Sequence, residues 1–315
     1  MAPPRTAAIV TCYNQERFIR QALDSLVAQT VPPAEVVVID GHSSDRSVAV
    51  IERWIAENEV PFELTFIRHD RNYGLCATLN QGMAAISSEF VLTLYGDDWL
   101  DARRIEIQAP ILAETTDDVA MAIGNLREVD RRGVPLAEID YSAKLAPLHE
   151  MSPVRRLASL ITENVIASPA VLLKADHVRA VGGYDESLTF DDYDMWLRLL
   201  SVSTFVHHHD IVVNYRILGN SLSRSRERHG DFLLSEAKMV SKHRGIDSDI
   251  DARIARRLDA TVAKLAEMDD AARLRAVARL QEQLGRTRGT SLVRALTRVP
   301  GGTGLIAALR KKNAA

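Results

Sequence analysis

Four short apolar runs, separated by segments of helical periodicity, constrain the fold of this chain more than any other feature. The runs occupy residues 7–12, 35–40, 64–68 and 90–95. The second is almost entirely β-branched, which is typical of a strand covered on both faces. The segments between the runs carry apolar residues three and four positions apart, as amphipathic helices do. Strands that alternate with helices in this way predict an α/β fold with a parallel sheet and crossover helices.

Polar side chains follow each of these predicted strands. In chain order they are Tyr13 and Asn14, then Asp40, then His69 and Asp70, and finally Asp97 and Asp98. Parallel strands present their carboxyl ends at one edge of a sheet, where α/β proteins bind ligands, so we expect these side chains to lie close together. The sequence lacks the Gly-x-Gly-x-x-Gly and P-loop patterns that cradle phosphates. Phosphate groups of a ligand would therefore have to be held by a metal ion.

The adjacent carboxylates Asp97 and Asp98 are the predicted metal ligands. They follow the apolar run 90–95 through Gly96. Two neighbouring carboxylates repel each other unless a cation offsets their charge. Mg²⁺ and Mn²⁺ prefer oxygen ligands and commonly combine one or two carboxylates with phosphate oxygens. The alternative is a solvated turn, since Gly-Asp-Asp also suits a loop that starts a helix.

A second acidic pair, Asp191 and Asp192, precedes a segment with apolar residues at helical spacing. An aspartate at this position often caps a helix. Only one of the two can cap the same helix, which leaves the other carboxylate free for chemistry.

Composition is ordinary for a soluble globular protein. The 315 residues carry a net charge of −3, so no overall basic field indicates nucleic-acid binding. Two cysteines are too few for a disulfide framework and fit a reducing compartment. No basic-then-apolar leader and no apolar run of about 18 residues is present. We therefore expect a cytoplasmic protein.

Several motifs in this order resemble the family 2 glycosyltransferases, inverting enzymes with the GT-A nucleotide-diphospho-sugar transferase fold. The similarity spans residues 6–223. It rests on the segments 11–14, 38–47, 72–74, 80–82, 95–98, 182–185 and 191–198.

The resemblance implies a metal-dependent enzyme that moves one sugar from a UDP- or dTDP-sugar to a hydroxyl of a saccharide, a lipid-linked molecule or a small molecule. It further implies a role in glycan or cell-surface polysaccharide synthesis. Asp192, with Asp191 beside it, matches the catalytic base, and Asp97, helped by Asp98, matches the site of Mn²⁺ or Mg²⁺. The implied donor contacts are Thr11, Tyr13, Asn14, Asp40, Asn72, Gly74, Asp97 and Arg216.

Three residues depart from the family pattern. Tyr95 stands at the first acidic position of the Asp-x-Asp motif, Leu79 where many relatives are basic, and Leu218 where a histidine is frequent. The alternative is therefore a degenerate nucleotide-binding or scaffold protein of the same fold without transfer activity.

Residues 224–315 are predicted to form a helical extension beyond the catalytic domain of residues 1–223. Its last part is basic and amphipathic, which suits peripheral contact with an anionic membrane surface, here the inner face of the cell membrane. The alternative is a helical appendage that packs on the catalytic domain or on a second subunit of a homo-oligomer. The run His207-His208-His209 is interpreted as an exposed strand start rather than a metal site, because no acid or cysteine lies at ligand spacing.

Overall fold

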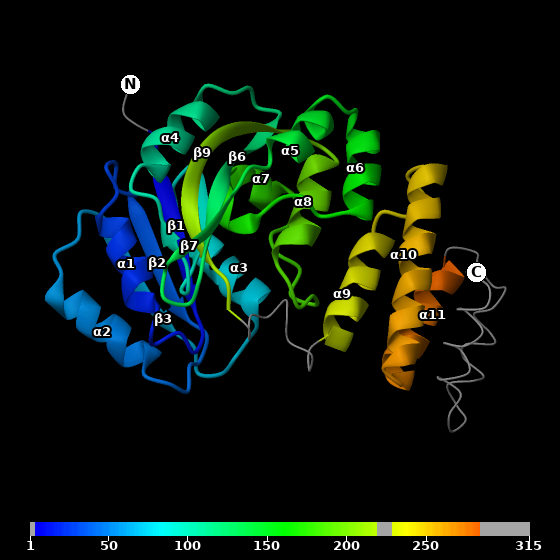
Figure 1. The fold of residues 1–315 in the computed structure, drawn as a ribbon, viewed down its shortest axis with the longest axis horizontal. Coiled ribbons are helices and arrows are strands. Elements are labelled where there is room, and N and C mark those ends of the chain that lie inside the picture. The colour runs from blue at the N-terminus through cyan, green and yellow to red at the C-terminus, as the bar shows by residue number, and fades with distance from the viewer. Residues whose placement is uncertain (1–3, 219–228, 284–315) are drawn as a thin grey trace. The chain divides into compact units, whose positions relative to one another are not determined.

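A computed structural model describes residues 4–218 and 229–283 (Figure 1). The described residues divide into two compact units. The first comprises residues 4–156, 165–186 and 191–218, and the second comprises residues 157–164, 187–190 and 229–283. The predicted boundary at residue 223 and the predicted basic tail beyond residue 283 lie outside the described residues.

The first half of the first unit is the predicted parallel sheet. Its strands lie in the order β3-β2-β1-β4, and each neighbouring pair is parallel. The crossover helices are α1 (Ile19–Val27), α2 (Ser47–Glu57) and α3 (Leu75–Ala85). The strands are β1 (Thr6–Cys12), β2 (Glu35–Asp40), β3 (Glu63–Arg68) and β4 (Phe90–Tyr95). All seven predicted elements of this half are confirmed.

The second half of the sheet is mixed, and the described residues place nine strands in it altogether. Strand β8 is antiparallel to both β4 and β6, whereas β6 and β9 are parallel. Short β5 pairs with β9, and β7 pairs with β6. The bounds are β5 (Trp99–Leu100), β6 (Val119–Val129), β7 (Pro135–Ile139), β8 (Val171–Lys174) and β9 (Thr204–Arg216). The α/β expectation is thus confirmed, with antiparallel strands added beyond β4.

The other helices before β9 include α8 (Asp192–Leu200), which was predicted from the apolar spacing after the acidic pair. Further helices are α4 (Arg104–Ala113), α5 (Ser142–His149) and α7 (Ala175–Ala180) in the first unit, and α6 (Pro153–Thr162), of which residues 157–162 belong to the second unit. The 3₁₀ turn η1 (Ser168–Ala170) precedes β8, and α5 lies with β7 in a stretch whose polar sequence carries no clear periodicity.

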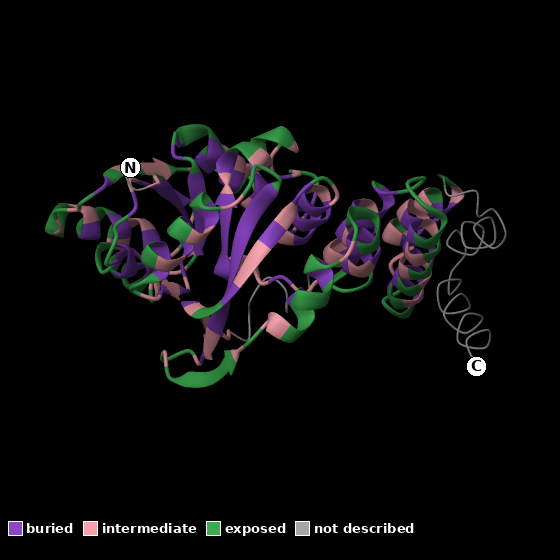
Figure 2. Ribbon diagram, turned by 90° about the horizontal axis from the view of Figure 1, so that it is seen from above, coloured by how far each residue is buried: buried purple, intermediate pink, exposed green. Residues whose placement is uncertain are grey.

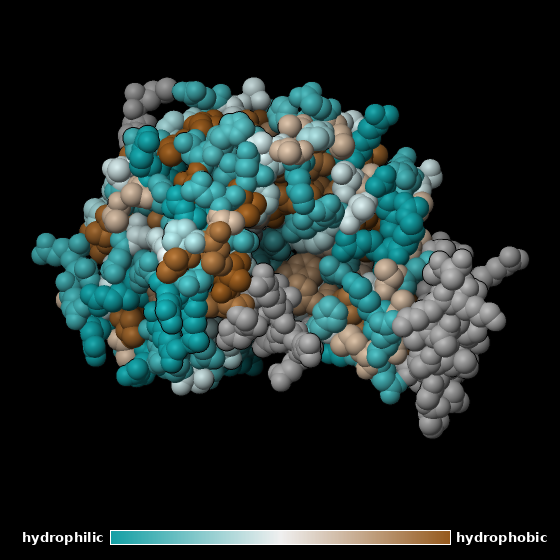
Figure 3. Space-filling model, in the orientation of Figure 1, coloured by the Kyte–Doolittle hydropathy of each residue, from teal (hydrophilic) through white to brown (hydrophobic). Residues whose placement is uncertain are grey.

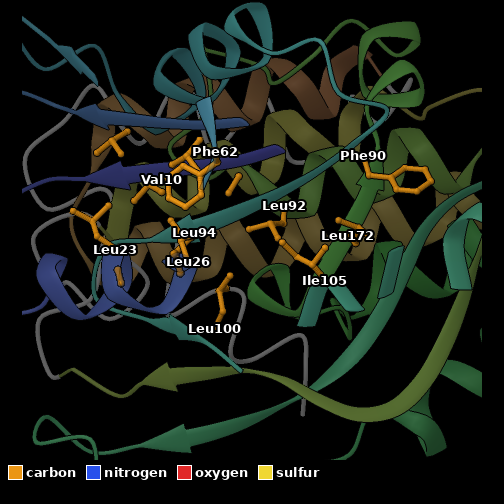
Figure 4. Packing of buried hydrophobic residues seen from close by; sticks show 14 of the residues in the cluster. Val10, Leu23, Leu26, Phe62, Phe90, Leu92, Leu94, Leu100, Ile105 and Leu172 are labelled. Carbon is orange, nitrogen blue, oxygen red and sulfur yellow. The ribbon is translucent and has the colours of Figure 1, made fainter. Parts of the chain in front are cut away.

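One apolar cluster holds α1, α2 and α4 on one face of the sheet. Val10 of β1 and Leu94 of β4 face Leu23 and Leu26 of α1 in this cluster (Figure 4). All four are fully or almost fully buried, and burial of each such side chain contributes about 1.5–3 kcal/mol. Figure 2 shows the central strands buried along most of their length, while hydrophilic side chains cover the visible surface over α2 (Figure 3).

Helix α3 packs closely on the opposite face of β1 through Gly82. A Cβ atom at Gly82 would lie 2.6 Å from Cγ2 of Ile9 and within 3.1 Å of two further atoms of the same side chain. Glycine is therefore required here by the closeness of helix and strand, although glycine inside a helix costs about 1 kcal/mol relative to alanine.

We expect Gly82→Ala to lower the free energy of unfolding by about 1–2 kcal/mol, because overpacking of about 1–3 kcal/mol exceeds the gain in helix propensity. Urea unfolding measures the change. In the background Ile9→Ala the same substitution should become neutral or stabilising, since the clashing atoms are gone. A loss of equal size in both backgrounds would contradict a steric cause.

The described part of the predicted helical extension, residues 229–283, contains three helices that pack against one another. They are α9 (His229–Ser241), α10 (Ser248–Glu267) and α11 (Ala271–Gln283). Asp247 caps α10 by accepting a hydrogen bond from the Asp249 amide. The rings of Phe190 and Phe232 lie 5.3 Å apart within the second unit. No helix within residues 4–218 and 229–283 is both long and apolar enough to span a bilayer.

Candidate active site

The carboxyl ends of β1, β2, β3 and β4 meet at one edge of the sheet, as their parallel pairing requires. Backbone hydrogen bonds join the loops just beyond the strands. The Gly41 amide donates to the Cys12 carbonyl at 2.8 Å, and the Gly96 amide donates to the Thr11 carbonyl at 2.9 Å. The expectation that the polar strand ends share one edge is confirmed.

Asp40 is fixed at this edge with its carboxylate almost fully enclosed, since only 1% of the residue is exposed. Its Oδ1 accepts a hydrogen bond from the Ser43 amide at 2.8 Å, and its Oδ2 accepts one from Ser43 Oγ at 2.6 Å. Ser43 Oγ in turn accepts a hydrogen bond from the Asn14 amide at 2.9 Å. Ser43, which belongs to the matching segment 38–47, thus links the predicted donor residues Asp40 and Asn14.

The loop after β1 forms one wall of the edge. Asn14 has a left-handed backbone with φ of 55°, and its Oδ1 accepts a hydrogen bond from the Ser44 amide at 2.8 Å. This conformation leaves the neighbouring Tyr13 45% exposed, while Thr11 is buried under the loop. Of the three predicted base-pocket residues, Tyr13 therefore presents a free aromatic face, and Asn14 and Thr11 shape the wall.

Asn72 and Gly74 form an exposed turn in front of α3. Asn72 Oδ1 accepts a hydrogen bond from the Gly74 amide at 2.8 Å, and Gly74 has a φ of 89°, which favours glycine. Tyr73 between them is exposed, and its hydroxyl donates to Asp70 at 2.8 Å. Asn72 and Gly74 thus fix the conformation of this turn, and their contact with the donor stays a prediction.

Asp97 lies at the end of β4 and is held by Gln15. Gln15 Nε2 donates to Asp97 Oδ1 at 2.9 Å. Gly96 permits this approach, because a Cβ there would lie 2.5 Å from Gln15 Oε1. Burial raises the pKa of Asp97 above its ordinary value. Sequence reasoning missed Gln15, and its position beside Tyr13 and Asn14 in the loop after β1 was the available signal.

Asp98 lies deeper than Asp97, with 2% of the residue exposed. Its Oδ1 accepts a hydrogen bond from the Arg216 amide at 2.8 Å, while its buried Oδ2 has no hydrogen-bond partner among the described residues. Burial, followed by the charge of Asp97, raises the pKa of Asp98 well above its ordinary value. Burial and mutual repulsion thus disfavour the negative charges of these two carboxylates, and one oxygen of Asp98 has no hydrogen-bond partner among the described residues. Both observations fit a bound divalent cation.

Arg216 organises the floor beneath this pair. Its guanidinium lies between the rings of Phe18 and Trp99, at 4.6 and 4.9 Å from their centres. It donates to the carbonyls of Asp97 and Arg131, both at 2.8 Å, and to Gln21 Oε1 at 2.7 Å. The predicted contact with a diphosphate would require Arg216 to release one of these bonds, and it stays a prediction.

The second acidic pair is tied to the end of β4 through Tyr95. Tyr95 Oη donates to Asp191 Oδ2 at 2.6 Å and lies 2.9 Å from Ser168 Oγ. Burial and the charges of Asp191 and Asp192 raise the pKa of Tyr95 well above 10, so it remains a donor. Burial also raises the pKa of Asp191, of which 7% is exposed. The residue at the first acidic position of Asp-x-Asp thus binds the second acidic pair.

Asp192 begins α8 and is more exposed than Asp191. Asp191 occupies the N-cap position of α8, but its side chain makes no capping hydrogen bond. The alternative of a capping role is therefore wrong for Asp191, whereas Asp192 Oδ1 accepts a hydrogen bond from the Tyr193 amide in the first turn at 2.7 Å. The hydrogen bond from Tyr95 to Asp191 fixes the position of the first turn of α8, which begins with Asp192.

Other parts of the matching motifs have positioning roles that the sequence did not indicate. Arg198 bonds Asp194 Oδ2 at 2.7 Å and also donates to the carbonyls of Val181 and Gly183. Asn80 of α3 pairs with the backbone of Tyr184, accepting from its amide and donating to its carbonyl, both at 2.8 Å. These contacts fix the turn at residues 182–184 against α3 and α8.

Comparisons with known proteins agree with this architecture. Residues 7–157 match the family described as Glycosyl transferase family 2. An uncharacterized glycosyltransferase of Rickettsia felis is 26% identical over 72% of this chain and 36% of its own length. The amylovoran biosynthesis glycosyltransferase AmsE of Erwinia amylovora is 26% identical over 74% of this chain and 83% of its own length. This chain spans between 36% and 64% of the first two curated relatives that it matches.

Solved structures show the same fold. S. aureus TarS (residues 1–349) in complex with UDP-GlcNAc has a TM-score of 0.62 at 16% identity, over 97% of this chain and 89% of that one. The mannosyltransferase PcManGT from Pyrobaculum calidifontis, in complex with GDP-Man and Mn²⁺, has a TM-score of 0.59 at 18% identity, over 98% and 87%. The expected GT-A fold is thereby confirmed. Residues 7–157 thus belong to glycosyl transferase family 2, and the chain has the fold of these glycosyltransferase structures.

Proposed function

We propose that this chain is a metal-dependent inverting glycosyltransferase that moves one sugar from a UDP- or dTDP-sugar to a hydroxyl acceptor. The observation that carries the proposal is the Tyr95–Asp191 hydrogen bond. It joins the acidic pair at 191–192 to β4, the strand that Asp97 follows, although Tyr95 and Asp191 lie 96 residues apart in sequence. Both halves of a displacement site, one for the leaving group and one for the attacking hydroxyl, are thus assigned to one edge of the sheet.

The nucleoside is assigned to the loops after β1 and β2. Asp40 is held in one orientation by Ser43, and contact of its carboxylate with a pyrimidine or ribose would require the loop that encloses it to open. The exposed ring of Tyr13 supplies an apolar face for the base. The two structural neighbours bind nucleotides of different bases, UDP and GDP, and the preference for a pyrimidine rests on Asp40 in this proposal.

Asp97, supported by Asp98, would hold Mn²⁺ or Mg²⁺. When bound, such an ion stabilises the negative charge that develops on the diphosphate leaving group. Gln15 and Arg216 keep Asp97 in place through its Oδ1 and its carbonyl. A positioned ligand needs little reorganisation when the charge develops.

Asp192 is assigned as the general base. As the acceptor oxygen attacks the anomeric carbon, Asp192 takes the hydroxyl proton and the bond from that carbon to the diphosphate oxygen breaks with both electrons. A single displacement inverts the anomeric centre and needs no protein nucleophile. Asp191, held by Tyr95, positions the base without receiving the proton.

The acceptor is assigned to the saccharide class, free or lipid-linked, with a small molecule as the remaining option. AmsE, which matches 74% of the chain, is named for amylovoran biosynthesis, and this supports a role in cell-surface polysaccharide synthesis. The proposal places this reaction in the cytoplasm or at the inner face of the cell membrane.

Calorimetric and thermal-shift titration with UDP, dTDP, GDP and their sugars, with and without Mn²⁺, tests the donor site. We expect UDP or dTDP to stabilise the wild type only with Mn²⁺, by about 2.7 kcal/mol at a hundred times Kd. Asp97→Ala should lose this response, whereas Asp117→Ala, which removes an exposed carboxylate in the turn before β6, should keep it.

Absence of binding by every nucleotide would defeat the proposal. Metal-dependent binding without turnover of the sugar nucleotide by any acceptor or by water would favour the scaffold alternative.

A further inference from the structure

Two histidines of β9 and an aspartate before α5 bring their ligand atoms to one place in the first unit. His207 and His209 lie on the same face of the strand, because side chains alternate along a strand, and their ring centres are 5.0 Å apart. Asp140 reaches the same place from the turn between β7 and α5. One ligand atom from each of the three lies within 4.8 Å of the others. The carboxylate that joins the two histidines thus comes from a segment far away in sequence, and it lies 4.0 Å from His209 Nδ1, whereas the adjacent Asp210 pairs with His208.

We propose that Asp140, His207 and His209 bind a divalent transition-metal ion, with zinc as the preferred ion. Two imidazole nitrogens and one carboxylate form a donor set that zinc takes in proteins, and Mg²⁺ prefers oxygen ligands alone. The site differs in both residues and chemistry from the carboxylate pair at Asp97. It does not depend on the proposed glycosyl transfer.

Asn125 supports the three ligands from beneath. It belongs to β6 and is 5% exposed. Its Nδ2 donates to the His209 carbonyl at 2.9 Å, and its Oδ1 accepts a hydrogen bond from the Tyr141 amide at 3.0 Å. The same Nδ2 lies 3.3 Å from Asp140 Oδ1. One buried amide therefore fixes both ligand-bearing segments, as outer-shell groups do in metal sites.

Ser142 marks the point on which the ligand atoms converge. Its Oγ lies 2.9 Å from His207 Nε2 and 2.9 Å from His209 Nδ1, and it also bonds Asp140 Oδ1. A hydroxyl on a single rotatable bond can swing away, and an ion at the same point would face the same three atoms.

An ion at this point would join α5 to β9. Helix α5 follows the exposed hairpin strand β7, whose residues are mostly exposed to solvent. Metal that binds only the folded chain adds to stability by mass action. The role of the site is therefore structural: it fastens the β7–α5 segment to the long strand.

The experiment is equilibrium dialysis of the untagged full chain against Zn²⁺, together with the visible absorption spectrum of the Co²⁺-substituted protein. We expect one ion per chain and the strong absorption of a low-coordinate cobalt site. Asp140→Asn, His207→Ala and His209→Ala should each weaken binding at least as much as Asn125→Ala, for which we expect roughly 10–100-fold. Asp140→Asn keeps an oxygen to accept the Ser142 amide hydrogen bond and removes the charge, so it separates ligation from folding.

The controls are His177→Ala on α7 and Asp97→Ala at the donor site, both of which should bind Zn²⁺ as the wild type does. Ser142→Ala should retain binding, because it removes the competing hydroxyl and leaves all three ligands. Failure to bind one Zn²⁺ per chain at free Zn²⁺ concentrations below about 0.1 mM would overturn the proposal. An affinity weaker than this is low for a protein metal site and comparable to that of extracellular calcium-binding modules. Equal weakening by His177→Ala, or none by the three ligand variants, would overturn it as well.

Discussion

Asp192→Asn is expected to lower kcat by about 10²–10⁴, the usual contribution of a general base, and to leave the affinity for the sugar nucleotide unchanged. Asparagine keeps the shape of the side chain and its place at the start of α8 but cannot take a proton. The predicted donor contacts lie on β1, β2 and β9 and in the loops after β1, β3 and β4, all outside α8, so they should not sense the change. The rate at which nucleoside diphosphate is released, with an acceptor present or with water as the acceptor, gives kcat. Calorimetry gives the donor affinity.

Tyr95→Phe tests whether Asp191 positions this base. The Tyr95 hydrogen bond lowers the pKa of Asp191 against the larger effect of burial. Loss of the hydroxyl should raise that pKa further, so Asp191 would become protonated at a higher pH. The acidic limb of the kcat profile should then move to higher pH, with a smaller loss of rate at neutral pH than in Asp192→Asn. An unchanged profile, or a full loss of kcat in Tyr95→Phe with Asp192→Asn still active, would contradict these roles.

The strand ends could be predicted from sequence because they follow from local pattern and one topological rule. Each apolar run with a polar residue after it marks a strand and its end. Once the strands are known to be parallel, Asp40 and Asp97 must share an edge. The confirmed parallel pairing of these four strands shows that no tertiary information was required for this part.

Contacts between distant segments could not be predicted in the same way. Nothing local to Tyr95 indicates that its hydroxyl meets Asp191, and nothing local to Arg216 indicates that carbonyls of residues 97 and 131 take its donors. Both side chains are polar groups that the fold encloses. Their hydrogen-bond partners depend on which loops, distant in sequence, pack beside them. The departure of Tyr95 from Asp-x-Asp suggested degeneration in the sequence, whereas the structure gives it a partner.

The histidine run shows the same limit. On sequence alone it resembles a solvated strand start, because ligand spacing can be seen only within one segment. In the structure β9 begins three residues earlier, at Thr204, and His208 is buried. Strand β6 pairs with both β7 and β9, and this brings Asp140, which follows β7, close to His209 of β9. The polar sequence before α5 gave no indication of β7.

Asp97→Asn should abolish metal-dependent donor binding and lower kcat by at least about 10²–10³, the effect of removing one group that stabilises developing charge. Without the carboxylate the ion loses its most accessible protein ligand. The remaining Asp98 is enclosed and already accepts the Arg216 amide. Calorimetry with the tightest-binding sugar nucleotide and Mn²⁺ measures the first effect, and nucleoside diphosphate release measures the second.

The same variant should be more stable than the wild type in the absence of metal. Because burial raises the folded-state pKa of Asp97, the folded chain loses stability relative to the unfolded chain as pH rises from about 3.9 through that pKa. At pH 7 the ionised carboxylate therefore opposes folding, and asparagine removes this cost while relieving Asp98. We expect a gain of about 0.5–2 kcal/mol at pH 7 that disappears below pH 4. Saturating Mn²⁺ and nucleotide should reverse the order by stabilising only the wild type, and a variant that is less stable at pH 7 without metal would show that Asp97 serves the fold rather than the ion.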